Sequence, residues 1–181
     1  MNRKKELKEK LMNKYLGSTS FINCMFMRFV KSDGYHIYKF LFHLKYYEYL
    51  ITLKTNPIKK IQRLLNLREY QKHAQILGFT IGDGVLGENI TFFHKGNIMI
   101  NPAAKVGDGC MFHGNCCIGV SRTFEEGAPV IGKNVDIGFG AVILGDIYIA
   151  DNIKIGANAV VTKSFYEPGI TIAGVPAKRT R

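Results

Sequence analysis

The sequence predicts a mainly β protein, a parallel β-helix of hexapeptide repeats that follows an α-helical N-terminal extension. Two observations support this fold class. Aliphatic residues recur every six positions towards the C-terminus, and the charge and composition of the chain change near residue 75. A period of six fits neither an α-helix nor an alternating strand, and it is typical of a solenoid of stacked coils. We therefore expect the helical extension over residues 1–75 and the β-helix domain with its C-terminal tail over residues 76–181.

The repeat is most regular near the C-terminus. Its first apolar position is occupied at six-residue intervals by Ile131, Ile137, Ile143, Ile149, Ile155 and Val161. A second apolar side chain follows each of these four residues later, at Val135, Ala141, Ile147, Ile153, Ala159 and Phe165. We expect both sets to point into the core, while the small residue that mostly follows the first position lets the chain turn a corner.

The period is interrupted twice. It begins at Leu86 and reaches Phe92, but the next position in phase is Ile100, so that two extra residues place His94 in a bulge. A second gap, between Ile118 and Ile131, predicts that residues 121–127 form a loop outside the repeat. Insertions in a solenoid tend to mark its binding face.

Residues 1–75 read as four helices. We expect them at residues 2–15, 21–31, 35–54 and 56–75, the last opened by an Asn-Pro cap and first turn. The aromatic third segment is expected to pack against other helices or a partner subunit, with membrane contact as the alternative. No stretch is long and apolar enough to span a bilayer, and the basic N-terminus lacks the apolar run of a signal peptide.

The net charge of +11 is confined to the extension. Residues 1–75 hold 16 of the 25 lysines and arginines but only 5 of the 14 acidic residues. This asymmetry indicates either solvated helical faces or an anionic partner such as a lipid surface or an acidic glycan. The basic residues are scattered and no nucleic-acid-binding motif is present, so we expect no nucleic-acid partner.

The four cysteines form no disulfide framework and no CxxC pair. Cys110 and Cys116 occupy inner positions of the repeat, where they are expected to fill the core. The cysteine usage favours a cytoplasmic location. If the basic helices bind lipid, the protein would lie at the inner face of the membrane.

Two histidines are the candidate catalytic residues. His94 in the bulge is expected to be exposed and able to accept a proton. His113 should lie on the same side one coil later, where it would orient His94 or help to bind the acceptor. A metal held by both histidines and a ligand from another subunit is the alternative, but the repeat region has no third histidine, and we expect no metal.

Four segments in order, residues 94–107, 127–132, 155–163 and 172–178, resemble the hexapeptide-repeat acyltransferases, and within them the serine acetyltransferase-like branch found also in polysaccharide gene clusters. The resemblance implies a left-handed β-helix, a homotrimer with active sites between subunits, acetyl-CoA as the acetyl donor and His94 as the catalytic base. It implies that coenzyme A lies beside the later coils, with cofactor contacts from Gly140, Ala141, Gly156, Ala157, Lys163, Ala173, Gly174 and Lys178.

The chain departs from the serine acetyltransferase pattern at three positions. Phe93 stands where an acidic residue precedes the catalytic histidine, and Gly127-Ala128 replaces an Arg-His pair. An ungapped count places Phe79 where that family has the aspartate that orients the base, so that His113, Glu88 or a backbone carbonyl would have to orient His94. These differences disfavour free serine as the acceptor and favour a sugar hydroxyl.

Three hypotheses for the function follow. The first is an acetyl-CoA-dependent O-acetyltransferase acting on a saccharide or a related acceptor, with His94 as the general base. The second is serine O-acetylation in cysteine biosynthesis. The third is a non-catalytic trimeric binding or scaffold protein that uses the basic helices.

Overall fold

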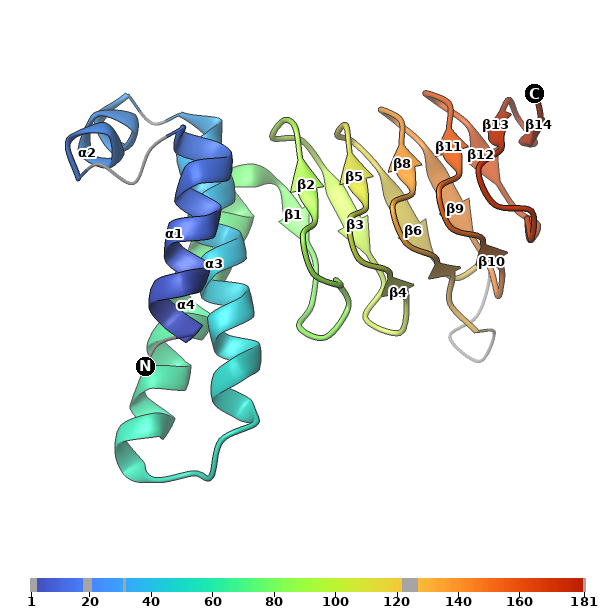
Figure 1. Cartoon of the computed structure of the whole chain (residues 1–181). Helices are drawn as coiled ribbons and strands as arrows, with labels where there is room; N and C mark the ends of the chain where they lie inside the picture. Colours follow the sequence, from blue (N-terminus) through green and yellow to red (C-terminus); the bar gives the residue numbers. More distant parts are fainter. Residues whose placement is uncertain (1–2, 18–20, 31, 122–126, 181) are drawn as a thin grey trace. The chain divides into compact units, whose positions relative to one another are not determined.

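The computed structural model of the chain describes residues 3–17, 21–30, 32–121 and 127–180. It divides into two compact units, residues 1–78 and residues 79–181. The first unit is helical and the second is built of short strands (Figure 1).

The helical unit contains α1 (Arg3–Leu16), α2 (Phe21–Phe29), α3 (Asp33–Ile51) and α4 (Pro57–Leu77). The two longest helices, α3 and α4, run side by side as an antiparallel pair (Figure 1). The core of this unit comes mainly from α3, whose fully buried side chains include Ile37, Tyr38, Phe40 and Leu44. Aromatic side chains of α3 thus pack inside the helical unit, as one of the two sequence interpretations proposed.

The ends of the long helices follow from local chemistry. Ser32 and Asn56 cap α3 and α4, since their side-chain oxygens accept hydrogen bonds from the backbone N–H groups of Tyr35 and Lys59. Gly78 ends α4 in the left-handed conformation, with a φ of 77°. No helix among the described residues is long and apolar enough to cross a membrane.

The second unit is a left-handed parallel β-helix with three faces. Its first face contains β1 (Phe79–Thr80), β3 (Ile98–Ile100), β6 (Cys117–Gly119), β9 (Val142–Leu144) and β12 (Val160–Val161). Its second face contains β4 (Lys105–Val106), β7 (Val130–Ile131) and β10 (Tyr148–Ile149). Its third face contains β2 (Thr91–Phe92), β5 (Met111–Phe112), β8 (Asp136–Ile137), β11 (Lys154–Ile155), β13 (Thr171–Ala173) and β14 (Lys178–Arg179).

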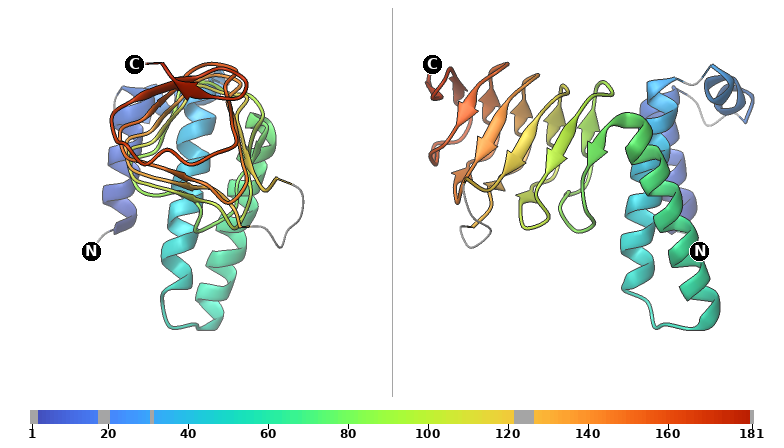
Figure 2. Two further views of the ribbon diagram at one scale, coloured as in Figure 1. Left: turned by 90° about the vertical axis from the view of Figure 1, so that its right-hand side faces the viewer. Right: turned by 180° about the vertical axis from the view of Figure 1, so that it is seen from behind.

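The hexapeptide positions form the core of the β-helix, as the period predicts. All six first-position residues from Ile131 to Val161 are at most 3 % exposed. The second-position residues from Val135 to Ala159 are also buried, whereas Phe165 is only half-buried at the end of the series. Coils stack in register, seen along the axis in Figure 2, and all the pairs are parallel except the last, β13 with β14.

The register confirms the first interruption. Phe92 pairs with Phe112 and Ile100 pairs with Ile118, so the chain uses two residues more between β2 and β3 than between β5 and β6. The second predicted insertion, residues 121–127, falls mostly on residues 122–126, which lie outside the described residues.

Candidate active site

Most of the predicted site residues lie along one edge of the β-helix, where the chain passes from the third face to the first; we call this the His113 edge. Successive coils stack in register there, which brings residues far apart in the sequence to one line. Backbone hydrogen bonds tie the corners together: Gly140 N–H donates to the Gly114 carbonyl, and Val160 N–H donates to the Gly174 carbonyl. The edge carries His94, His113, Gly140, Ala141, Gly156, Ala157, Ala173 and Gly174.

His113 is held by an aspartate of the next coil. Its Nε2 lies 2.8 Å from Oδ1 of Asp136 in β8. The Phe93 ring of the preceding coil stacks on the His113 ring, with a centroid separation of 4.6 Å and an interplanar angle of 24°. The His113 side chain remains 41 % exposed, and that of Asp136 is 30 % exposed. The imidazole is therefore fixed by two contacts while part of it still faces solvent.

The hydrogen bond to Asp136 sets the chemistry of the ring. A carboxylate accepts from Nε2–H, which leaves Nδ1 as the atom with the free lone pair. Orientation by a carboxylate also stabilises the imidazolium that forms when the ring takes up a proton. His113 with Asp136 has the features of a general base and its orienting group.

Asp136 was not among the orienting groups that the sequence suggested. It pairs in register with Met111, twenty-five residues earlier, since the insertion between Ile118 and Ile131 lengthens this coil. A count of eighteen residues per coil misses it. Subtracting the inserted residues from the coil would have placed Asp136 beside Met111, two positions from His113.

His94 lies in the bulge and is exposed, as expected from the phase shift. The structure, however, sets Phe93 against His113. Within the described parts of the chain, no hydrogen bond joins His94 to His113 or to any carboxylate. The two histidines share the edge, but Asp136 contacts only one of them.

Tight stacking of the coils and backbone conformation explain why glycine occupies two of the predicted cofactor positions. A Cβ on Gly156 would lie 2.8 Å from the Cβ of Ala173, and Gly140 has a φ of 73° that favours glycine. Ala141 is fully buried in the core of the β-helix. Ala157 and Gly174 are exposed on the edge.

The two lysines predicted to meet phosphates are placed differently. Lys178 in β14 pairs with Ala173, so it lies at the end of the His113 edge and is exposed. Lys163 follows β12 at the corner between the first and second faces, with its ammonium 5.5 Å from the ring centroid of Phe165. The structure thus brings one of the two lysines to the edge and leaves the other at a neighbouring corner.

The cysteines of the β-helix are unsuited to nucleophilic catalysis. Burial raises the pKa of the Cys110 thiol to about 11, and burial also raises the pKa values of Cys116 and Cys117. Cys110 and Cys116 are at most 1 % exposed and fill the core, as predicted. Among the described residues, no group of three or more His, Cys, Asp or Glu is arranged to hold a metal ion.

The pair Gly127-Ala128 offers no ionic group. The Ala128 side chain is 8 % exposed and faces the core of the repeat. A side chain at Gly127 would collide with the carboxylate of Asp146, 2.6 Å from the Cβ position. An amino-acid acceptor would find no positive charge at these two positions.

Part of this chain is similar in sequence to known proteins. No family model matches the chain. The chain is 37 % identical over 102 residues to the serine acetyltransferase of Buchnera aphidicola subsp. Schizaphis graminum, a match that covers 56 % of this chain and 32 % of that protein. It is 33 % identical over 105 residues to the serine acetyltransferase of Helicobacter pylori strain 26695, covering 57 % of this chain and 61 % of that protein. The chain therefore spans between a third and three fifths of the length of these relatives.

Solved structures give the same result for the fold. The apoenzyme of soybean serine acetyltransferase superposes with a TM-score of 0.65 at 25 % identity, covering 81 % of this chain and 58 % of that chain. Serine acetyltransferase of Neisseria gonorrhoeae, solved in complex with serine, superposes with a TM-score of 0.65 at 22 % identity, covering 99 % of this chain and 69 % of that one. In sequence and fold together, this chain is similar to hexapeptide-repeat acyltransferases of the serine acetyltransferase type.

Proposed function

We propose that the protein is an acetyl-CoA-dependent O-acetyltransferase in which His113, oriented by Asp136, is the general base. The observation that carries this proposal is the 2.8 Å contact between His113 Nε2 and Asp136 Oδ1 on a partly exposed edge of a serine acetyltransferase-like β-helix. The sequence hypothesis that His94 is the base is kept as the alternative, because His94 is exposed on the same edge. It ranks second because it has no carboxylate partner among the described residues.

The proposed reaction uses the His113 ring as a proton carrier. Nδ1 removes the proton from the acceptor hydroxyl while the oxygen attacks the thioester carbonyl. The resulting tetrahedral oxyanion collapses, the carbon–sulfur bond breaks, and the thiolate of coenzyme A takes the proton back from the imidazolium. Asp136 stabilises that imidazolium through the hydrogen bond at Nε2. No covalent acyl-enzyme is needed, in keeping with the raised thiol pKa values of Cys110 and Cys116.

We propose that acetyl-CoA lies along the His113 edge towards the later coils, where Ala157, Gly174 and Lys178 are exposed. Exposed backbone there suits a pantetheine arm, and a lysine suits a phosphate. We propose further that three copies assemble with this edge at the subunit contact. Light scattering of the purified protein would test the number of copies.

For the acceptor, L-serine is the first candidate because the relatives described above are named serine acetyltransferases. A saccharide hydroxyl is the second candidate. Its support is the lack of ionic side chains at Gly127 and Ala128 and the apolar Phe93 beside His113. A sugar ring also packs well on an exposed aromatic face, and Phe93 is 45 % exposed.

The base assignment is tested by two matched variants, His113→Ala and His94→Ala, assayed by release of the coenzyme A thiol. Loss of the general base should lower the rate by about 10²–10⁴-fold. We expect this loss for His113→Ala and only a small change for His94→Ala. The reverse order would return the role of base to His94, and full activity in both variants would contradict histidine catalysis on this edge.

The acceptor is tested with L-serine beside nucleotide-linked and lipid-linked sugars, again following thiol release. We expect turnover with serine if the site binds the amino acid through groups other than Gly127-Ala128. Turnover with a sugar alone would favour the saccharide hypothesis. No thioester cleavage with any acceptor, in a protein that also fails to bind coenzyme A, would contradict the proposed function and favour the scaffold hypothesis.

A further inference from the structure

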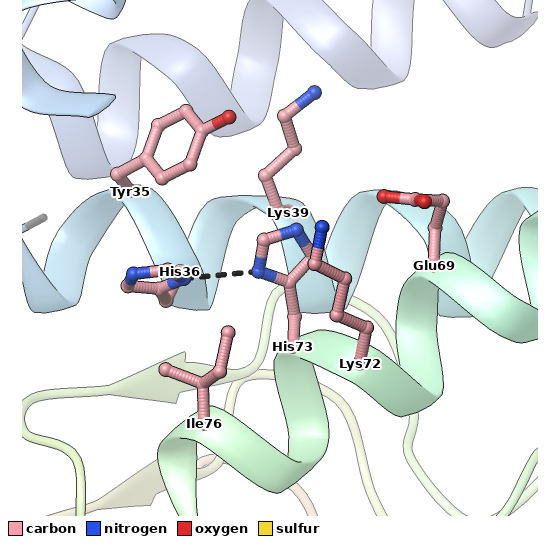
Figure 3. A pocket seen from close by; sticks show the side chains of 7 residues that line it. All are labelled: Tyr35, His36, Lys39, Glu69, Lys72, His73 and Ile76. Atoms are coloured by element: carbon pink, nitrogen blue, oxygen red, sulfur yellow. Dashed lines mark hydrogen bonds between the residues drawn. The ribbon is translucent and has the colours of Figure 1, made fainter. Parts of the chain in front are cut away.

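The helical unit contains a pocket that the proposed acetyl transfer does not use. It lies between α3 and α4 and has a volume of about 550 Å³, within the range of small-molecule sites. Figure 3 shows the side chains that line it, which come from both helices: Tyr35, His36, Lys39, Glu69, Lys72, His73 and Ile76. Five of these seven carry nitrogen or hydroxyl groups able to donate hydrogen bonds.

Two histidines meet at the pocket. Nδ1 of His36 lies 3.0 Å from Nδ1 of His73, so one ring donates and the other accepts (Figure 3). His73 is only 5 % exposed and makes no further hydrogen bond within the described chain. Every fully buried side-chain nitrogen or oxygen in the described chain has a partner, so the Nε2 of His73 is not fully enclosed, and His73 is one of the residues that line the pocket. A buried ring thus presents one nitrogen to a ligand.

The charges around the pocket favour an anion over a cation. Lys39 and Lys72 line it together with the two histidines, against the single carboxylate of Glu69. A divalent metal would face both ammonium groups, whereas a phosphate would gain charge-assisted hydrogen bonds from them. The surrounding residues 1–75 carry the whole net charge of +11, which draws anions to this unit.

We infer that this pocket is a binding site for a phosphate-bearing ligand, held by Lys39 and Lys72 with the His36–His73 pair beneath them. The ligand is a soluble phosphorylated molecule or the phosphate of a lipid headgroup, which share this chemistry. The site is independent of the proposed acetyl transfer, because its residues all belong to α3 and α4.

The protonation of His73 responds to such a ligand. Burial, followed by the nearby His36, His43, Lys39 and Lys72, lowers the pKa of His73 to about 4, so the ring is neutral in the empty pocket at neutral pH. Glu69 is the one lining group of opposite charge. A bound phosphate would raise the pKa of His73 towards its ordinary value, and binding would tighten as the pH falls.

The test uses the full chain with inorganic pyrophosphate as the soluble probe. Calorimetry measures affinity, and NMR titration of the histidine ring protons follows the pKa of His73. Three proteins are compared: the wild type, the double variant Lys39→Gln/Lys72→Gln, and Lys60→Gln as a matched control, since Lys60 is an exposed lysine of α4 outside the pocket. Sedimentation with phosphatidylglycerol vesicles, against phosphatidylcholine vesicles, tests the headgroup source.

We expect saturable pyrophosphate binding that raises the pKa of His73, about tenfold or more weaker in the double variant and unchanged in Lys60→Gln. Binding to phosphatidylglycerol alone, with the same dependence on Lys39 and Lys72, would support a lipid headgroup as the source. Binding that is equal in all three proteins, or no binding of either probe, would overturn the proposal. These binding measurements are independent of acetyl transfer, which is measured by thiol release in the wild type and in His113→Ala.

Discussion

At the scale of single residues, the contact between His113 and Asp136 carries the proposed chemistry. Neither residue is deeply buried, and the sequence pattern singles out only His113. The β5–β8 register places Met111 beside Asp136, and His113 follows two positions later with its ring turned towards that carboxylate. Phe93 covers the ring from the preceding coil. The orientation of the His113 ring is thus a product of three successive coils.

Replacing Asp136 by asparagine should lower kcat by about 10- to 10³-fold, because the amide keeps the shape but removes the charge that orients the imidazole and stabilises its protonated form. KM should stay nearly constant, since Asp136 is proposed to act through His113 and not on the substrate. Steady-state kinetics would check both values. Partial recovery in Asp136→Glu would support a positioning carboxylate, while a raised KM at constant kcat would point to acceptor binding.

At the scale of elements, the coils of the β-helix depend on residues that accept a left-handed backbone at their corners. Five asparagines of the repeat unit have a positive φ between 51° and 61°: Asn89, Asn115, Asn134, Asn152 and Asn158. Asparagine tolerates this region far better than β-branched residues do. These corners let each strand of two or three residues end and the next begin on another face.

The variants Asn158→Val and Asn158→Gly test this role at one corner, where φ is 55°. Valine should lower the free energy of unfolding by about 1–3 kcal/mol because it is strained at positive φ. Glycine adopts the same backbone without strain and should change the stability little. Denaturant unfolding of the two variants would measure the difference, and equal stabilities would show that the backbone at this corner relaxes.

At the scale of the whole molecule, the two units differ in their response to acid. His73 is the one buried side chain among the described histidines, lysines, arginines, aspartates and glutamates, and it belongs to the helical unit. Burial also lowers the pKa of His43 in the same unit. The core of the β-helix is aliphatic and aromatic, and the rings of Phe79, Phe92 and Phe112 contact one another in series at its start.

The helical unit should therefore lose stability first as the pH falls. The pKa of His73 is lowered from 6.5 to about 4, so the unfolded chain binds a proton more readily than the folded one between these values. The contribution of neutral His73 to the free energy of unfolding is fully present above pH 6.5. It is lost as the pH falls towards 4, which lowers the free energy of unfolding by about 3 kcal/mol. Circular dichroism of the helical signal during chemical denaturation at several pH values would measure this loss.

In His73→Gln the free energy of unfolding should depend less on pH. The dependence that is left should come from His43, whose pKa is also lowered by burial. An unchanged pH dependence in that variant would contradict the assignment to His73. Saturating pyrophosphate should also oppose the acid loss in the wild type, since a ligand that binds only the folded state stabilises it.

Local pattern was sufficient for much of this structure. The period of six determined the β-helix and most of its core, because each inward position depends only on its place in its own coil. The phase shift located the bulge at His94, and the Asn56-Pro57 pair located the start of α4. Phe165 is the inward position at which the pattern failed, since the end of the series leaves it half-buried.

What only the tertiary structure decided are the pairings between coils and between helices. The insertion between Ile118 and Ile131 shifts the count so that Asp136, and not a residue near His94, meets His113. His36 and His73 meet across two helices although they lie 37 residues apart. A repeat or an amphipathic pattern specifies which side of an element faces inward, but a side-chain contact also requires the register between elements, which long-range packing sets.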